Sequence, residues 1–226
     1  MTASAFDFPF NDERLKITQS PSGYRYSLDA LLIADFAKIN PKDRVLDLGA
    51  GCGVISMILA ARHSSAAIYG VEILKEQVSV GRQNIINNCM TDRVTLLHQD
   101  IKTLMPAMTS GRMDVVISNP PHIQKASGRI NPNPQVAAAR HEIHVTLKDI
   151  MDAARRMLRP SGRLYMIYPA GRMADVIARM RQANIEPKTL TILYTRSDAP
   201  ARRILIEGVN GGGAEMTITP PLFIDS

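Results

Sequence analysis

From Lys42 onward, short apolar runs rich in β-branched residues alternate with amphipathic stretches. This alternation is typical of repeated strand–helix units and predicts an α/β fold built on a mostly parallel sheet. Seven runs have the length and composition of strands, and they cover residues 44–48, 67–72, 93–98, 114–118, 163–168, 189–194 and 203–209. A further run at residues 216–218 is too short to assign.

In several of the stretches between these runs, apolar residues recur with the period of a helix that has one buried face. We expect helices over residues 28–38, 54–62, 147–158 and 173–180. Residues 122–140 show neither helical nor strand period and contain three Gly or Pro turn dipeptides. A loop of this length inside a compact domain is usually functional or mobile.

Length and composition exclude several classes of protein. The 226 residues suffice for one well-cored domain, and no apolar run approaches the ~18 residues that a membrane span needs. The first ten residues lack the basic and apolar regions of a secretory signal, so we expect a cytoplasmic protein. Two cysteines, Cys52 and Cys89, are too few for a disulfide framework. They also lack the spacing of zinc ligands, so no metal is expected. The net charge of +6 favours an anionic partner.

A glycine turn follows the first expected strand. Gly49, Gly51 and Gly53 alternate with other residues, and glycine there allows positive φ and close approach of a ligand. The spacing lacks the third glycine of the dinucleotide-binding fingerprint, which disfavours nicotinamide chemistry. Asp47 lies at the strand end, where a carboxylate can meet a cationic amino group. Glu72 ends the second strand, nineteen residues beyond Gly53, where it can accept both hydroxyls of a ribose.

These residues resemble motif I and the acidic second-strand motif of class I S-adenosylmethionine-dependent methyltransferases. The resemblance implies a Rossmann-like fold, S-adenosyl-L-methionine as cofactor, and adenine binding near Asp100. Position alone leaves open whether Asp100 serves the cofactor or caps the next helix. The cofactor-binding residues that the resemblance implies are Tyr26, Ser27, Asp47, Leu48, Gly49, Ala50, Gly51, Gly53, Glu72, Ile73, Asp100, Ile101 and Asn119.

The fourth expected strand ends in Asn119-Pro120-Pro121-His122. Two consecutive prolines remove two amide donors, so this turn offers carbonyl acceptors that no sheet ladder can use. If the Asn119 side-chain oxygen and the Pro120 carbonyl accept the hydrogens of an amine, its nitrogen can aim a lone pair at a methyl donor. A proline-terminated strand with an Asn-initiated turn is the alternative interpretation. The Asn-Pro-Pro turn lies downstream of a glycine turn, and this context favours a function in amine binding over the structural alternative.

The turn resembles the [DNS]-P-P-[YFWH] motif of methyltransferases that act on adenine N6, guanine N2 or glutamine. That resemblance assigns the catalytic role to Asn119, Pro120, Pro121 and His122. The fourth residue of the motif is usually an aromatic that stacks on a base turned out of its helix. Histidine stacks with less area than tyrosine and adds a pH dependence. Because unstacking a paired base costs more, we expect a target in a loop.

Three further segments resemble one family, the bacterial tRNA1(Val) adenine-37 N6-methyltransferases. They are residues 23–32 (GYRYSLDALL), 138–143 (AARHEI) and 220–222 (PPL), and the resemblance extends from about residue 14 to 224. It implies that Tyr26 and Ser27 cover the cofactor and that residues 140–142 lie beside the substrate. Ser27 as a helix N-cap, and residues 140–142 as an ordinary helix start, are the structural alternatives.

Basic residues are concentrated between positions 122 and 163. Eight cationic residues there are balanced by only three acidic residues, and this excess of positive charge favours binding of a phosphate backbone. A solvated helix face accounts for part of the excess. The cations are Lys125, Arg129, Arg140, Lys148, Arg155, Arg156, Arg159 and Arg163. We assign substrate binding to Lys125, Arg129, Arg140 and His141, with RNA contact by the cluster as a whole.

The sequence therefore predicts a single-domain α/β methyltransferase with a seven-stranded, mostly parallel sheet whose final strand is antiparallel. Residues 1–40 form a cofactor-covering segment and residues 41–226 the catalytic core. The expected reaction is methylation of adenine N6 in the anticodon loop of a tRNA, by a protein taken here as a monomer. The alternatives are a ribosomal guanine N2 methyltransferase, a protein glutamine N5 methyltransferase, and a non-catalytic RNA-binding module that retains the cofactor fold.

Overall fold

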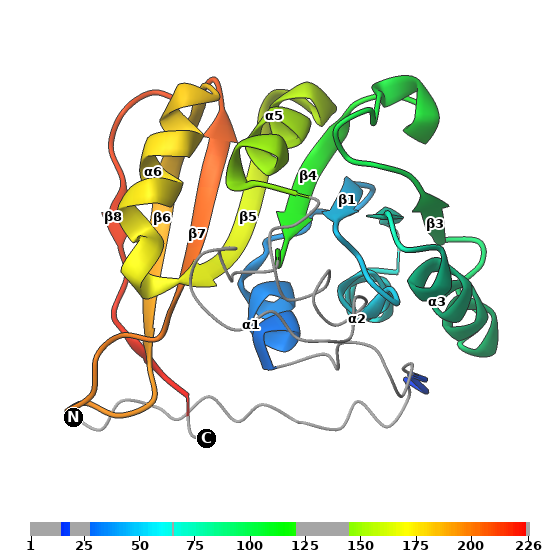
Figure 1. Cartoon of the computed structure of the whole chain (residues 1–226), viewed down its shortest axis with the longest axis horizontal. Coiled ribbons are helices and arrows are strands. Elements are labelled where there is room, and N and C mark those ends of the chain that lie inside the picture. Colours follow the sequence, from blue (N-terminus) through cyan, green and yellow to red (C-terminus); the bar gives the residue numbers. More distant parts are fainter. Residues whose placement is uncertain (1–14, 19–27, 65, 121–144, 225–226) are drawn as a thin grey trace.

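The computed structural model describes residues 15–18, 28–64, 66–120 and 145–224. Helices pack on both faces of one twisted sheet (Figure 1). The elements in chain order are α1 (Leu28–Phe36), β1 (Arg44–Leu48), α2 (Val54–Arg62), β2 (Ala67–Glu72), α3 (Lys75–Asn87), β3 (Val94–His98), the 3₁₀ turn η1 (Pro106–Thr109), β4 (Met113–Ser118), α5 (Leu147–Met157), β5 (Leu158–Pro169), the 3₁₀ turn η2 (Ala170–Arg172), α6 (Met173–Gln182), β6 (Ile185–Tyr194), β7 (Arg203–Asn210), β8 (Thr217–Ile218) and β9 (Leu222–Phe223).

The sheet has the order β3-β2-β1-β4-β5-β7-β6-β8, and β9 also pairs with β6. Strands β1 to β5 pair in parallel, whereas β7 is antiparallel to both β5 and β6. The α/β class, the mostly parallel sheet and the antiparallel strand are thus confirmed. The predicted count of seven strands is wrong, because the described residues form nine. The two additional strands, β8 and β9, have two residues each, too few to show an alternating pattern.

Each face of the sheet has its own apolar core. On β1, Val45 belongs to the cluster with α1, α2 and α3, whereas Leu46 and Leu48 belong to the cluster with α5 and α6. This division follows from the two-residue period of a strand. It also places Asp47 on the same face as Val45, beneath α2. Asp47 is therefore a buried acidic residue near the carboxyl end of β1.

Strand β5 contains an irregularity around Pro160. Met113 on β4 pairs with Leu158, but Val115 pairs with Arg163, so the four residues between them bulge out of the ladder. Ser161 takes a φ of 59° there. Because the ladder accommodates this bulge, β5 begins at the residue that follows the end of α5.

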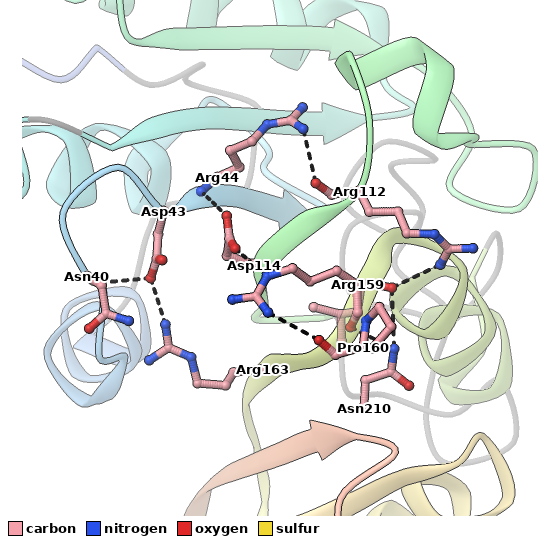
Figure 2. A network of polar contacts seen from close by, with 10 residues as sticks. Asn40, Asp43, Arg44, Arg112, Asp114, Arg159, Pro160, Arg163 and Asn210 are labelled. Carbon is pink, nitrogen blue, oxygen red and sulfur yellow. Dashed lines mark hydrogen bonds and ion pairs between the residues drawn. The ribbon is translucent and has the colours of Figure 1, made fainter.

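Arginines tie together the amino ends of β1, β4 and β5 (Figure 2). Arg163 donates to Asp43 Oδ2 at 2.6 Å and to the Lys38 carbonyl at 2.6 Å. Asp114 accepts hydrogen bonds from the Arg44 amide, at 2.8 Å, and from the Arg159 guanidinium. Burial opposes ionisation of Asp114, but these two donors and their charges outweigh it and hold its pKa below the ordinary value. The network joins three strand starts through polar contacts.

Arg156 has the same kind of role. Its guanidinium donates to the carbonyls of Leu104 and Ile101 at 2.6 and 2.7 Å. Arg163 pairs with Val115, four residues before Asn119 on the neighbouring strand, which corresponds to ~13 Å along β4. We expected the basic segment to lie near the substrate loop. Arg159 and Arg163 lie instead at the amino ends of the strands, and the guanidinium groups of Arg156, Arg159 and Arg163 all bond to their own chain.

Replacing Arg163 with methionine is expected to lower the free energy of unfolding by about 2–4 kcal/mol, because Asp43 stays buried and loses its cation. Urea denaturation measures this change. Arg155→Met, on an exposed position of α5, is the matched control and should cost less than about 0.5 kcal/mol. Equal effects of the two substitutions would contradict a structural role for Arg163.

Candidate active site

The turn between β1 and α2 depends on left-handed backbone at every second residue. Gly49, Gly51 and Gly53 have φ of 78°, 55° and 81°. A Cβ at any of the three would meet nothing within 4 Å, so conformation rather than space requires glycine. The amides of Gly49 and Ala50 both donate to the Val71 carbonyl, at 2.9 and 3.0 Å. The turn is thus fixed to the end of β2.

Asp47 lies directly beneath this turn with no exposed surface. Its Oδ2 accepts a hydrogen bond from Ser56 Oγ at 2.8 Å, while its Oδ1 has no partner among the described residues. Gly70 is opposite Asp47 on β2, and a Cβ there would lie 3.1 Å from Ser56 Oγ. Glycine at position 70 therefore makes room for the Asp47–Ser56 pair.

Burial raises the pKa of Asp47 to about 7, against the bond from Ser56 that lowers it. An unpartnered carboxylate oxygen in a dry site is energetically unfavourable unless a ligand occupies it. A cationic amino group placed at Oδ1 would supply both a donor and an opposite charge. The arrangement suits a ligand such as an α-amino acid.

Glu72 connects the glycine turn to α3. Its Oε2 accepts the Gly51 amide at 3.0 Å, and its Oε1 accepts the Leu74 amide at 2.9 Å. Each carboxylate oxygen has a second acceptor site, so the side chain can hold the turn and still accept ligand hydroxyls. The neighbouring Ile73 is half-buried, and its carbonyl lies 3.0 Å from His98 Nε2.

Asp100, at the end of β3, takes part in a local turn. Its Oδ1 accepts the Lys102 amide at 2.8 Å, and its Oδ2 lies 3.5 Å from Lys102 Nζ. The capping alternative considered for Asp100 is thus present, although it caps an isolated turn rather than a helix. Ile101, which follows it, is buried.

The carboxyl end of β4 lies beside the glycine turn. Asp47 pairs with Ile117 in the parallel ladder, and Ser118 Oγ donates to the Leu48 carbonyl at 2.9 Å. Asn119 therefore comes level with Gly49 on the adjacent strand, and neighbouring strands are ~4.8 Å apart. The strand order reverses between β1 and β4, which is where open α/β sheets bind ligands. Asn119 is half-buried there, and Pro120 is buried.

Of the predicted site residues, the structure brings Asp47, Leu48, Gly49, Ala50, Gly51, Gly53, Glu72, Asn119 and Pro120 together at this edge. It places Ile73, Asp100 and Ile101 at the carboxyl ends of the neighbouring β2 and β3. Eight predicted residues lie outside the described part of the chain: Tyr26, Ser27, Pro121, His122, Lys125, Arg129, Arg140 and His141.

Sequence reasoning missed Ser56, Gly70 and Ser118. Each had a signal, because Ser56 is a polar residue in an otherwise apolar helix and Ser118 ends an apolar strand. Gly70 interrupts a β-branched strand, which often marks close approach of another group.

Within the described ranges, no three His, Cys, Asp or Glu side chains gather as metal ligands would. The helices of those ranges are all too short or too polar to cross a membrane.

A family model described as a methyltransferase domain matches residues 39–203. The chain belongs to this methyltransferase family. A relative from Dyadobacter fermentans, named tRNA1(Val) (adenine(37)-N6)-methyltransferase, is 26% identical over 94% of this chain and 86% of its own length.

Two solved methyltransferases share the fold. A predicted O-methyltransferase from Agrobacterium tumefaciens covers 86% of each chain at a TM-score of 0.68 and 23% identity. Geranyl diphosphate C-methyltransferase from Streptomyces coelicolor, solved with Mg²⁺, geranyl diphosphate and S-adenosyl-L-homocysteine, covers 81% of this chain and 78% of its own at a TM-score of 0.56 and 14% identity.

The raised pKa of Asp47 predicts a specific pH dependence of stability. The pKa is about 7 in the folded state and 3.8 ordinarily, so this group's contribution is fully present below pH 4 and is lost as pH rises through 7. Relative to Asp47→Asn, the wild-type protein is expected to lose up to about 4 kcal/mol of unfolding free energy between pH 4 and 8.

Urea denaturation at several pH values measures this difference, and Asp92→Asn, at an exposed position, is the control. Parallel stability profiles for the wild-type protein and Asp47→Asn would contradict the assignment.

Proposed function

We propose that this methyltransferase transfers a methyl group from S-adenosyl-L-methionine to N6 of adenine 37 in the anticodon loop of tRNA1(Val). The observation that supports it most is the position of the Asn119 corner beside the glycine turn, bonded through Ser118 to Leu48. This arrangement sets an amine-binding corner next to a donor-binding turn. The name and nearly full-length match of the Dyadobacter relative support the tRNA substrate.

In this proposal the cofactor occupies the edge formed by β1, β2 and β3. When bound, S-adenosyl-L-methionine would supply a sulfonium methyl group that a nitrogen nucleophile can attack, with S-adenosyl-L-homocysteine as the leaving group. Asp47 Oδ1, unpartnered among the described residues, would hold the cationic amino group. Glu72 would accept the ribose hydroxyls through its free acceptor sites, and Asp100 and Ile101 would contact the adenine. Tyr26 and Ser27, within the N-terminal segment 1–40, would cover the site.

The chain's own contribution to the reaction is the orientation of the substrate amine. Asn119 Oδ1 and the Pro120 carbonyl would each accept one hydrogen of the exocyclic amine. With both hydrogens held, the lone pair turns out of the ring plane toward the donor. No strong base is needed before attack, because the extra proton becomes acidic once the methyl is gained. Pro121 would keep the corner rigid, and His122 would stack on the base.

The remaining assignments follow from this substrate. Lys125, Arg129, Arg140 and His141 would contact the tRNA backbone around the target. Residues 1–226 would act as one monomeric domain, with the catalytic core at residues 41–226. A tRNA substrate would agree with a cytoplasmic location.

Methyl transfer from labelled cofactor to separate pools of unmodified tRNA and ribosomal RNA tests the proposal. We expect label in N6-methyladenosine of tRNA, mapped by nuclease digestion and mass spectrometry to position 37. Label in N2-methylguanosine or in protein glutamine would contradict it in favour of the other amine substrates. Cofactor binding without any product would favour a non-catalytic RNA-binding module.

Asn119→Ala is expected to lower kcat by ~10²-fold or more, because the amine loses an oriented acceptor. The Kd for adenosylhomocysteine, measured by calorimetry, should change by less than about threefold. Asn119→Asp keeps the acceptor oxygen and should retain more activity than Asn119→Ala. Equal turnover of Asn119→Ala and wild-type protein would remove Asn119 from the mechanism.

A further inference from the structure

Asn84 on α3 and Asn88, which caps the carboxyl end of that helix, bind the backbone of residues 15–18. Lys16 donates its amide to Asn88 Oδ1 at 2.9 Å, and its carbonyl accepts from Asn88 Nδ2 at 2.9 Å. Thr18 repeats the pattern with Asn84, whose Oδ1 accepts the Thr18 amide at 2.9 Å and whose Nδ2 donates to the Thr18 carbonyl at 2.8 Å. Each side-chain amide thus pairs with a peptide group as a neighbouring strand would.

The spacing of the two asparagines explains this double pairing. Four helical residues rise ~6 Å, and two residues of extended chain span about 6.6–6.8 Å. Side chains four positions apart on a helix therefore match alternate peptide groups of an extended segment. Because Lys16 pairs with Asn88 and Thr18 with Asn84, the segment runs toward the amino end of α3. That end adjoins the carboxyl end of β2, where the glycine turn lies.

Apolar packing holds the same segment from the other side. Leu15 and Ile17 pack against the core shared by α1, α2 and α3, whereas Lys16 and Thr18 are exposed. Alternation of buried and exposed side chains agrees with an extended conformation. Residues 15–18 are thus docked both by their side chains and by their backbone.

Asn84 differs from Asn88 because it also reaches the glycine turn. Its side chain has no exposed surface, and its Nδ2 lies 3.5 Å from the Cys52 carbonyl. Gly81, one turn earlier on α3, faces the same peptide, since a Cβ there would lie 3.0 Å from both Cys52 C and O. The backbone of the turn therefore rests directly on this face of α3. Asn84 is the side chain that contacts both Thr18 and the turn.

We propose that Asn84 is a positioning residue that couples the docking of residues 15–18 to the glycine turn, and thereby to cofactor affinity. The inference rests on the proposed cofactor site. When residues 15–18 leave α3, the buried Asn84 side chain loses its hydrogen bonds to the Thr18 amide and carbonyl. It then no longer holds the Cys52 peptide in place. Coupling of this kind is reciprocal, so cofactor binding also stabilises the docked segment.

Hydrogen exchange and calorimetry test the coupling in the full-length protein, with adenosylhomocysteine as the probe. In the wild-type protein, saturation with adenosylhomocysteine should slow exchange of the Lys16 and Thr18 amides by about five- to tenfold. Asn84→Ala should abolish this slowing and raise the Kd by a similar factor. The KM for cofactor should rise with it, while kcat at saturation stays near the wild-type value.

Three variants separate coupling from a merely structural role. Thr18→Pro removes the amide hydrogen that Thr18 donates to Asn84 Oδ1 and leaves α3 unaltered. It should also raise the Kd for adenosylhomocysteine, and its effect should not add to that of Asn84→Ala. Asn88→Ala removes the other pairing but no contact with the turn, so its effect on Kd should be smaller. Asn87→Ala, exposed on the same helix, is the control and should change neither quantity.

The outcomes distinguish this inference from the proposed function. If wild-type protein binds the probe but Thr18→Pro leaves its Kd unchanged, the coupling is overturned and the cofactor site stands. A lower melting temperature of Asn84→Ala with an unchanged Kd overturns it equally. Failure of the wild-type protein to bind the probe contradicts both.

Discussion

The parallel pairing of β1 with β4 determines where the rest of the site lies. These two strands are neighbours in the sheet although 64 residues lie between Leu48 and Met113 in the chain. Their carboxyl ends are joined by the Ser118–Leu48 hydrogen bond. The next described helices after these strands, α2 and α5, pack on opposite faces of the sheet, and such a junction is where open α/β sheets bind ligands. A slip of one residue in this register would move Asp47 to the other face and separate Asn119 from the glycine turn.

The site is built at a cost that the surrounding cores offset. Asp47 is buried with an unpartnered oxygen, and three residues of the turn above it hold left-handed backbone. Neither feature would persist in a loosely packed region. The apolar clusters on the two faces of the sheet keep β1 in place, while the arginine network fixes the strand starts at the far edge. The arginine network thus lies at the end of the strands opposite the proposed ligand site.

The sequence predicted the local features well, because strands and glycine turns depend on neighbours in the chain. The bounds of β1 and β2 and the positive-φ turn required only period and spacing. The sequence did not predict contacts between residues far apart in the chain. Nothing near Arg163 indicates that it bonds to Asp43, 120 positions away, and nothing near Asn84 indicates Thr18 as its partner. The short strands β8 and β9 exist only because the edge of β6 is available to them.

That edge has a consequence for the behaviour of the protein in solution. An open sheet ends in a strand with unpaired amides and carbonyls, which can recruit a second molecule and begin aggregation. Here β8 and β9 cover β6 with two short pieces, and Pro220 and Pro221 lie between them. Proline has no amide hydrogen to offer an incoming strand. The Pro-Pro-Leu segment therefore leaves few free amides for strand addition at this edge of the sheet.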